Sequence, residues 1–283
     1  MGLIEFIRKI KLGIINLIYL RVYLVQANKR NYNSEIIVEA YSHWVGLKET
    51  EKRILNLLKY NLPHGIMLDI GVGAGRTTEC FSKICERYFG IDYSQNMIEY
   101  CIKKFKGMPN VSFMVLDARN LSIFENDAFN FVLFSHGGLD AVEHGDRIMI
   151  LKEIWRICKN GGYFCFSTSN LDAISQHCRV KFAKNPKFFP RMLVRLLLIR
   201  ILNPEMWAYS RGEKNNLQHT MFNVGGHDWG LRTYCITYKE QLEQLKNSGF
   251  WNIKVFDEGG KQFSNLSYIK DFELYFLCNA NKA

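Results

Sequence analysis

Three glycines at alternate positions, Gly71, Gly73 and Gly75, form the most informative motif in this 283-residue chain. They follow the apolar run Ile66–Ile70, which is typical of a buried strand, and they lead into a segment with helical spacing. Glycine lets the backbone approach a ligand closely, and the first N–H groups of a helix have no partner within that helix. The motif therefore predicts a cofactor cradle between a strand and a helix.

Two carboxylates accompany the glycines and restrict the choice of cofactor. Asp69 lies two residues before Gly71, and Asp92 lies at the end of the next apolar run, 17 residues after Gly75. A carboxylate at this position, at the end of the second strand, can accept hydrogen bonds from ribose hydroxyls. The dinucleotide fingerprint has the spacing Gly-x-Gly-x-x-Gly, and Asp69 would repel a pyrophosphate but suits a cationic amino-acid group. The pattern favours S-adenosylmethionine over NAD, and an NAD-dependent oxidoreductase is kept as an alternative.

Alternating strands and helices must hold these residues in place. Five short apolar runs are predicted strands: 66–70, 88–91, 111–116, 129–134 and 163–167. Helical segments lie between them at 77–86, from Ser94 onward and at 146–158. This alternation predicts a parallel sheet with helices on both faces. Because the strand ends of a doubly wound sheet line one crevice, Asp69, Asp92 and Asp117 are expected there together.

The chain resembles the class I S-adenosylmethionine-dependent methyltransferases over about residues 49–166 and 238–280. Four motifs carry the resemblance: Asp69 with the three glycines, Gly90-Ile91-Asp92-Tyr93-Ser94, Leu116-Asp117-Ala118, and the turn Asn160-Gly161-Gly162 after a helix. The resemblance implies a Rossmann-like, doubly wound α/β fold with a seven-stranded sheet. The last strand, near 271–279, is then expected to be antiparallel.

The same resemblance assigns roles to individual cofactor residues. It implies that Asp92 binds the ribose and that Tyr93 and Met97 lie near the adenine ring. It places Asp117 near the adenine amine, with Ala118 beside it. No one of these motifs is decisive, but their order and spacing together point to S-adenosylmethionine as the cofactor.

Four segments make up the predicted organisation: an N-terminal helical extension (1–48), the cofactor-binding core (49–169), an inserted substrate cap (170–232) and the rest of the core (233–283). The cap is predicted because the strand–helix pattern stops for some sixty residues, which is too long for a structureless loop in a compact domain. One helix is expected within it, at 188–202.

Aromatic residues before the first core helix are expected near the cofactor. The resemblance implies that this segment closes over the cleft, which would bring Tyr41 and Trp44 to the sulfonium, an arrangement that cation–π attraction favours. The alternative is that both rings simply pack against the sheet.

Two of the seven histidines are candidates for the proton acceptor that methylation of a hydroxyl requires. His136 follows the predicted strand 129–134, where a side chain can face the transferred methyl group, and Ser135 beside it is expected at the cofactor. His227 lies in a glycine-rich loop before the sheet resumes. For each histidine a purely structural role is the competing interpretation. No Cys/His group has zinc spacing and no carboxylate cluster has magnesium spacing, so metal-independent transfer is predicted.

The net charge of +10 is concentrated in two segments that are also rich in Leu and Ile. Residues 1–33 hold six basic residues and one acidic residue, and residues 176–215 hold nine basic and two acidic ones. The apolar stretch at 12–20 is too short to span a bilayer. We expect the two segments to form a lid over the acceptor, which would suit an anionic substrate. The alternative is that both lie on an anionic membrane, near a lipid-linked acceptor.

These observations predict a cytoplasmic methyltransferase of a small molecule, with a hydroxyl oxygen of a sugar or another metabolite as the acceptor. The alternative is a peripheral enzyme at the inner membrane face that methylates a lipid or a lipid-linked substrate. Nucleic acid is not expected as a partner, because Ser135-His136-Gly137-Gly138 stands where base-methylating enzymes have Asn/Asp-Pro-Pro-Tyr/Phe. The sequence leaves open the oligomeric state and the choice among oxygen, nitrogen and carbon.

Overall fold

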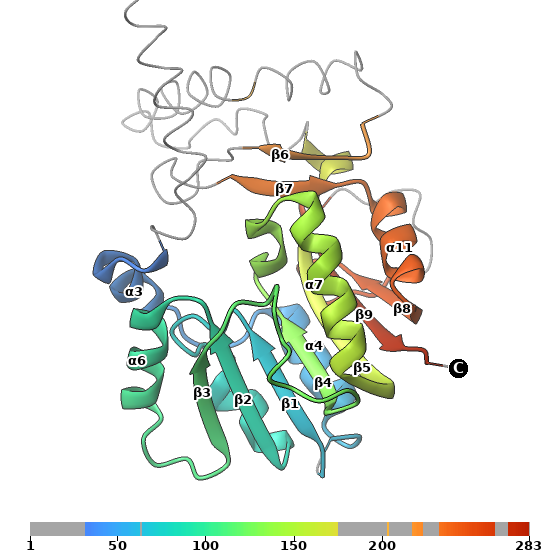
Figure 1. The fold of residues 1–283 in the computed structure, drawn as a ribbon. Helices are drawn as coiled ribbons and strands as arrows, with labels where there is room; N and C mark the ends of the chain where they lie inside the picture. The colour runs from blue at the N-terminus through green and yellow to red at the C-terminus, as the bar shows by residue number, and fades with distance from the viewer. Residues whose placement is uncertain are drawn as a thin grey trace, which may run out of the picture.

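The computed structural model describes residues 32–62, 64–174, 203, 217–222, 232–263 and 271–282. Strands and helices alternate along most of this length (Figure 1). The strands are β1 (Ile66–Ile70), β2 (Arg87–Asp92), β3 (Val111–Val115), β4 (Phe129–Phe134), β5 (Cys158–Asn170), β6 (His219–Phe222), β7 (Thr233–Ile236), β8 (Phe250–Phe256) and β9 (Glu273–Ala280). The α-helices are α3 (Glu35–Ser42), α4 (Glu49–Leu58), α5 (Thr78–Phe81), α6 (Gln95–Lys104), α7 (His144–Ile157) and α11 (Tyr238–Asn247). Three short 3-10 helices are η1 (Ser82–Ile84), η2 (Gly138–Ala141) and η3 (Leu171–Ala173).

Five parallel strands form one half of the sheet, in the order β3-β2-β1-β4-β5. β1 lies in the middle of this half, so Leu68 is opposite both Phe89 of β2 and Val132 of β4. The chain builds outward from β1 to β3 and then crosses back to β4. This reversal of strand order confirms the predicted doubly wound fold, and it brings the loops after β1 and β4 together at the switch point, where such folds bind ligands.

Antiparallel strands complete the sheet beyond β5. β9 runs antiparallel to β5, with Phe276 opposite Phe166, and β8 runs antiparallel to β9. The predicted antiparallel last strand is thus confirmed. Within the described residues the sheet has nine strands instead of the predicted seven, because the hairpin of β6 and β7 adds to the end of β5 at Ser169 and Asn170. Each hairpin strand has four residues of mixed polarity, which give no usable sequence pattern.

Helices cover both faces of the sheet, and each face has its own hydrophobic core. One core lies between the sheet and helices α7 and α11 and includes Leu151, Ile154 and Leu245. The other lies under α4 and α5 and includes Ile54 and Phe81. α7 crosses one face of the sheet and α4 the opposite face (Figure 1). Burial on both faces explains why the parallel strands are almost continuously apolar in sequence.

Two predicted elements differ in the structure by more than a residue or two at their ends. The helix predicted at 77–86 is only α5 followed by η1, after which the chain extends into β2. The strand predicted at 163–167 is the longer β5, which begins at Cys158 and contains the predicted turn at Gly161 and Gly162. The pairing of β4 with β5 extends beyond that turn: Phe129 of β4 is opposite Cys158, and the register shifts between Phe129 and Phe131.

Several predictions concern residues outside the described ranges: the helix at 188–202, His227, and the N-terminal segment up to residue 31. The boundaries of the cap at 170–232 therefore stay a prediction. No helix within the described ranges combines the length and the apolar character that crossing a membrane requires.

Candidate active site

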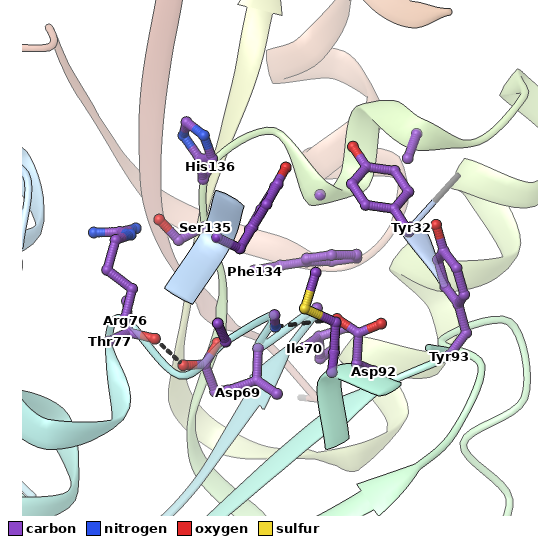
Figure 2. Close-up of a pocket in the computed structure, with 18 of the residues that line it drawn as sticks. Tyr32, Asp69, Ile70, Arg76, Thr77, Asp92, Tyr93, Phe134, Ser135 and His136 are labelled. Atoms are coloured by element: carbon purple, nitrogen blue, oxygen red, sulfur yellow. Dashed lines mark hydrogen bonds between the residues drawn. The ribbon is translucent and has the colours of Figure 1, made fainter. Parts of the chain in front are cut away.

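The loop after β1 borders a cleft at the carboxyl edge of the sheet (Figure 2). Gly71 and Gly73 have φ angles of 64° and 54°, in the left-handed region that L side chains rarely adopt. A Cβ atom on Gly71 would lie 3.0 Å from Cε2 of Phe134, so a larger residue would press on that ring. The two glycines let the loop turn tightly beside β4 while the cleft stays open.

Asp92 ends β2 and lines the same cleft. Its Oδ2 accepts a hydrogen bond from the Gly73 N–H at 3.1 Å, and its Oδ1 accepts one from the Ser94 N–H at 2.9 Å. Burial raises the pKa of the Asp92 carboxyl, and the backbone donors only partly offset this effect. Because each carboxylate oxygen can accept two hydrogen bonds, Asp92 keeps acceptor capacity for ribose hydroxyls.

Asp69 lies in β1 beneath the glycine loop and is only 2% exposed. Its Oδ2 accepts hydrogen bonds from the Thr77 hydroxyl and, at 2.6 Å, from the Tyr88 hydroxyl. Burial raises the pKa of Asp69 to about 6, although both hydrogen bonds oppose this shift. A cationic group in the cleft would favour the ionised form of this carboxyl.

Aromatic side chains form another wall of the cleft, which Tyr32, Tyr41, Trp44 and Tyr93 line. Trp44 stacks on Tyr41 with ring centroids 4.9 Å apart, and Tyr32 meets Tyr41 and Tyr93 edge to face. Tyr41 and Trp44 therefore lie at the cleft, as expected for a segment that closes over it. Their ring faces offer the electron density that attracts a sulfonium.

Most of the predicted site residues meet in this cleft. Those that line it are Asp69, Gly71, Gly73, Asp92, Tyr93, Met97, Ala118, Ser135 and His136. Gly75 and Asp117 are not among the lining residues: a Cβ on Gly75 would lie 2.3 Å from the Phe105 ring, and Asp117 forms an ion pair with Arg119 at 2.7 Å. His227 lies outside the residues that the structure describes.

A buried ion pair that the sequence did not indicate connects the walls of the cleft. Arg76 follows the glycine motif and binds both carboxylate oxygens of Glu51 at 2.5 Å, and it also donates to the Gly46 carbonyl at 3.1 Å. Glu51 accepts further hydrogen bonds from the Lys48 N–H at 2.8 Å and from the Ser135 hydroxyl. Burial alone would raise the pKa of Glu51, but Arg76 holds it below its usual value. Glu51 thus links the loops after β1 and β4 to the segment before α4.

His136 lies on the rim of the cleft, directly after β4, with an unusual φ angle of 55°. Its ring meets the Trp44 ring edge to face, with 4.9 Å between centroids. Burial and the nearby Lys48 lower the pKa of His136 to about 4, so the imidazole is neutral near physiological pH. A neutral imidazole at this place can accept a proton. Among the described residues, no group of three or more His, Cys, Asp or Glu is arranged to hold a metal ion.

Comparison with known proteins agrees with this geometry. Residues 67–162, which include Asp69 and Asp92, match the family described as Methyltransferase domain. The demethylmenaquinone methyltransferase of Staphylococcus saprophyticus is 28% identical over 243 residues, which cover 83% of this chain and 89% of that protein. The chain carries a class I S-adenosylmethionine-dependent methyltransferase domain.

Solved structures of methyltransferases share the fold. An S-adenosylmethionine-dependent methyltransferase from Clostridium acetobutylicum has a TM-score of 0.57 at 15% identity, covering 84% of this chain and 93% of that one. The 1,6-didemethyltoxoflavin-N1-methyltransferase of Burkholderia thailandensis has a TM-score of 0.52 at 13% identity, covering 83% of this chain and 80% of that one. That structure contains 1,6-didemethyltoxoflavin and S-adenosylhomocysteine.

The cleft of this methyltransferase fits S-adenosylmethionine. The glycine loop passes Phe134 at a distance that leaves no room for a Cβ on Gly71, and Asp92 has acceptor capacity where a ribose would lie. Asp69 would stabilise the amino group of the cofactor, and Tyr93 and Met97 would lie beside its adenine. The residues present therefore suit the amino group, the ribose and the adenine of S-adenosylmethionine.

Proposed function

We propose that this methyltransferase acts on a small molecule and transfers the methyl group to a hydroxyl oxygen. When bound, S-adenosylmethionine supplies an electrophilic methyl group on its sulfonium. The observation that carries the proposal is the position of His136, a neutral imidazole on the rim of the cofactor cleft and in contact with Trp44. A hydroxyl loses its proton as the new bond forms, and a neutral imidazole in hydrogen-bond reach of that hydroxyl can take the proton.

The other residues of the cleft would orient the reactants and exclude water. Glu51 binds Ser135, the neighbour of His136, and so holds the start of the loop that carries the proposed base. Tyr41 and Trp44 cover the side of the cleft where the sulfonium would lie. Orientation of this kind lowers the barrier of a bimolecular transfer substantially. His227 is the second candidate for the base.

The acceptor atom can be identified from the product. The protein would be incubated with S-adenosylmethionine that carries a ¹³C-labelled methyl group and with a panel of phenols, hydroquinones and sugars. We expect a labelled methyl signal with the chemical shift of an O-methyl group. A signal in the N-methyl or C-methyl range would show that the hydroxyl assignment is wrong.

A quinone or another lipid-linked molecule at the inner membrane face is the second candidate for the acceptor. The name of the staphylococcal relative, demethylmenaquinone methyltransferase, favours a quinone. Segments 1–33 and 176–215 combine basic residues with Leu and Ile, and each Lys or Arg close to an anionic membrane adds about 1 kcal/mol of binding free energy. A cytoplasmic enzyme that methylates a free metabolite has no need of such binding.

Liposome flotation separates these two locations. The full-length protein would be mixed at low salt with vesicles of phosphatidylcholine alone or with added phosphatidylserine. Membrane location predicts flotation only with the anionic vesicles, weaker flotation at high salt, and weaker flotation of a variant that lacks residues 1–30. A protein that stays with the unbound fraction in every mixture contradicts the membrane location and leaves the lid interpretation of the two segments.

A further inference from the structure

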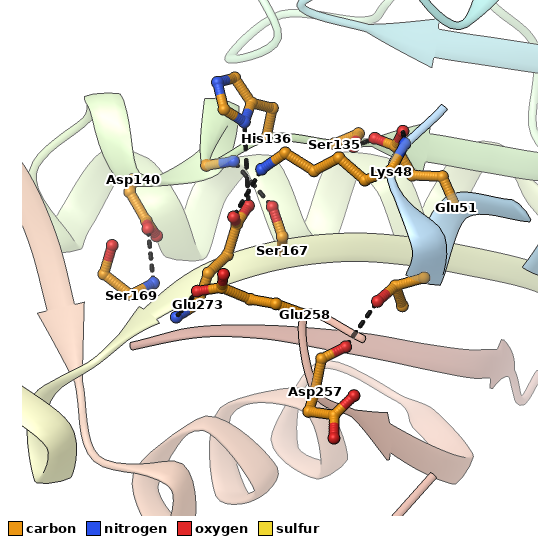
Figure 3. Close-up of polar contacts among 12 residues, drawn as sticks. Lys48, Glu51, Ser135, His136, Asp140, Ser167, Ser169, Asp257, Glu258 and Glu273 are labelled. Carbon is orange, nitrogen blue, oxygen red and sulfur yellow. Dashed lines mark hydrogen bonds and ion pairs between the residues drawn. The ribbon is translucent and has the colours of Figure 1, made fainter. Parts of the chain in front are cut away.

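Two buried polar atoms face each other at the rim of the cleft without a hydrogen bond. His136 Nδ1 lies 4.0 Å from Glu273 Oε1, and neither atom has a hydrogen-bond partner (Figure 3). A buried polar atom without a partner is costly, and native proteins contain few of them. A facing pair, one able to donate and the other able to accept, indicates a hydrogen bond that forms in another state of the site.

We propose that Glu273 is a positioning residue for His136: it accepts a hydrogen bond from Nδ1–H and leaves Nε2 free to take the proton of the acceptor. The proposal rests on the proposed role of His136 as the base. Glu273 begins β9, where its backbone is in register with Ser169 of β5. Its Oε2 is 2.6 Å from Lys48 Nζ, so one carboxylate oxygen is held and the other faces the imidazole. Figure 3 shows the second ring nitrogen on the side away from Glu273.

The loop that carries His136 is fixed on both sides of the histidine. Ser135 donates to Glu51, and the Gly137 N–H donates to the Ser167 hydroxyl at 2.8 Å. The φ angle of 55° at His136 is uncommon for a residue other than glycine, and such conformations persist where the surroundings impose them. Hydrogen bonds of catalytic groups are often long before the acceptor binds and shorten afterwards. A gap of 4.0 Å between two groups held in this way fits that behaviour.

The charges around His136 divide into two kinds. Lys48, just before α4, and Arg76, after the glycine loop, disfavour the imidazolium, whereas Glu51 of α4 and Glu273 of β9 favour it.

In the transfer, the hydroxyl proton moves to Nε2, and an electron pair of the hydroxyl oxygen forms the new bond to the methyl carbon. The bond between carbon and sulfur breaks, and its electron pair stays on sulfur. Burial and Lys48 therefore keep the base unprotonated beforehand, and Glu273 stabilises the imidazolium that results.

Nitrogen NMR of the histidine rings tests this arrangement without a known acceptor. The full-length protein would carry ¹⁵N-labelled histidine and be saturated with S-adenosylhomocysteine, and the His136 signals would be identified by their loss in His136→Asn. At pH 7.5 we expect the wild-type ring to be neutral with its proton on Nδ1. In Glu273→Met, which removes the acceptor, we expect the proton to shift toward Nε2.

Glu258→Met is the matched control for that substitution. Glu258 accepts a hydrogen bond from the Glu273 N–H at 3.3 Å, so it lies beside the same strand, yet it is not among the charges that act on His136. We expect its His136 spectrum to equal that of the wild type. A wild-type proton on Nε2, or the same tautomer in Glu273→Met as in the wild type, overturns the proposal.

Lys48→Met removes the positive charge near His136 instead of the negative one. This test does not depend on whether Glu273→Met folds. Loss of the ammonium group is expected to raise the pKa of His136, measured on the same signals. An unchanged titration curve overturns the proposed arrangement of charges. Calorimetry of S-adenosylhomocysteine binding and the product assay test the proposed function separately, since neither depends on which ring nitrogen carries the proton.

Discussion

The cofactor end and the acceptor end of the same cleft are assembled in different ways. At the cofactor end, the hydrogen bond between Gly73 and Asp92 joins residues 19 positions apart. At the acceptor end, the contact between Lys48 and Glu273 joins residues 225 positions apart, and His136 Nδ1 has no partner. Local sequence therefore preforms the part that binds the cofactor. The part proposed to bind the acceptor depends on contacts between distant parts of the chain, and it contains buried polar atoms without hydrogen-bond partners.

The largest effect is expected at the acceptor end and should leave the cofactor end unchanged. If His136 is the base, His136→Gln lowers kcat by a factor of about 10² to 10⁴. Cofactor affinity, measured by calorimetry with S-adenosylhomocysteine, should stay near the wild-type value, because the glycine loop and the carboxylates at the other end are intact. Initial rates with the acceptor found in the product assay provide the measurement.

The exposed histidine His64 supplies a matched control, since it does not line the cleft. His64→Gln is expected to keep full turnover. Full turnover in His136→Gln as well would assign the role of the base to His227, or would indicate a transfer without a base that relies on proximity alone.

A smaller effect is expected when the cofactor end is changed. Asp92→Ala removes the acceptor of ribose hydrogen bonds, each worth roughly 1.5–3 kcal/mol when a charged group takes part. The dissociation constant of S-adenosylhomocysteine should rise by a factor of about 10 to 150 for one such bond. Glu99→Ala, at an exposed carboxylate of α6 that does not line the cleft, is the control. Equal affinities of the two variants would contradict the assignment of Asp92 to the ribose.

The smallest effect is a dependence of cofactor affinity on pH, which Asp69 should produce. Its pKa of about 6 means that the carboxyl is mostly protonated at pH 5 and mostly ionised at pH 7.5. A cationic amino group requires the ionised form, so affinity for S-adenosylmethionine should fall about tenfold between pH 7.5 and pH 5. Asp69→Asn should bind more weakly at pH 7.5 and lose this dependence, whereas a wild-type affinity that does not change with pH would place the amino group elsewhere.

For the protein without cofactor, the same group acts on stability with the opposite sign. The pKa of Asp69 is raised above its ordinary value of 3.8, so the folded state holds this proton more tightly than the unfolded state does. The contribution of Asp69 to the free energy of unfolding therefore decreases as the pH rises from about 4 to about 6. Thermal melting of the wild type and Asp69→Asn across this range should show the difference, and S-adenosylmethionine should reduce it.

The parallel half of the fold could be predicted because each of its strands and turns leaves a pattern in residues that are close together in sequence. Strands such as β1 and β4 are buried on both faces, so they read as continuous apolar runs, and glycines mark the turns between them. The β6–β7 hairpin could not be predicted, since its pairing with β5 at Ser169 and Asn170 is a tertiary contact without a sequence pattern. The extension of β5 through a glycine turn was missed for the same reason.

The residues of the candidate site also fall into two groups: those with a pattern in the sequence and those that only the fold brings to the cleft. Asp69, Asp92 and the glycines were found because the chemistry of the cofactor requires fixed residue types at fixed spacing. Glu51 was missed because a glutamate in the first turn of a helix usually faces solvent and favours the helix dipole, and only the fold shows that it binds Arg76 in a buried pair. Glu273 gave no signal at all, since a charged residue at the start of a strand is ordinary in sequence.

The position of β9 has a consequence for the timing of synthesis. β9 lies between β5 and β8, although it is made after both of them. At a synthesis rate of about 5–20 residues per second, the glycine loop and Asp92 leave the ribosome seconds before Glu273 does. Glu273 therefore reaches Lys48 and His136 only after β9 has entered the sheet between two strands that were made before it. With Glu273 in its proposed role, methyl transfer must wait until the last described strand is in place.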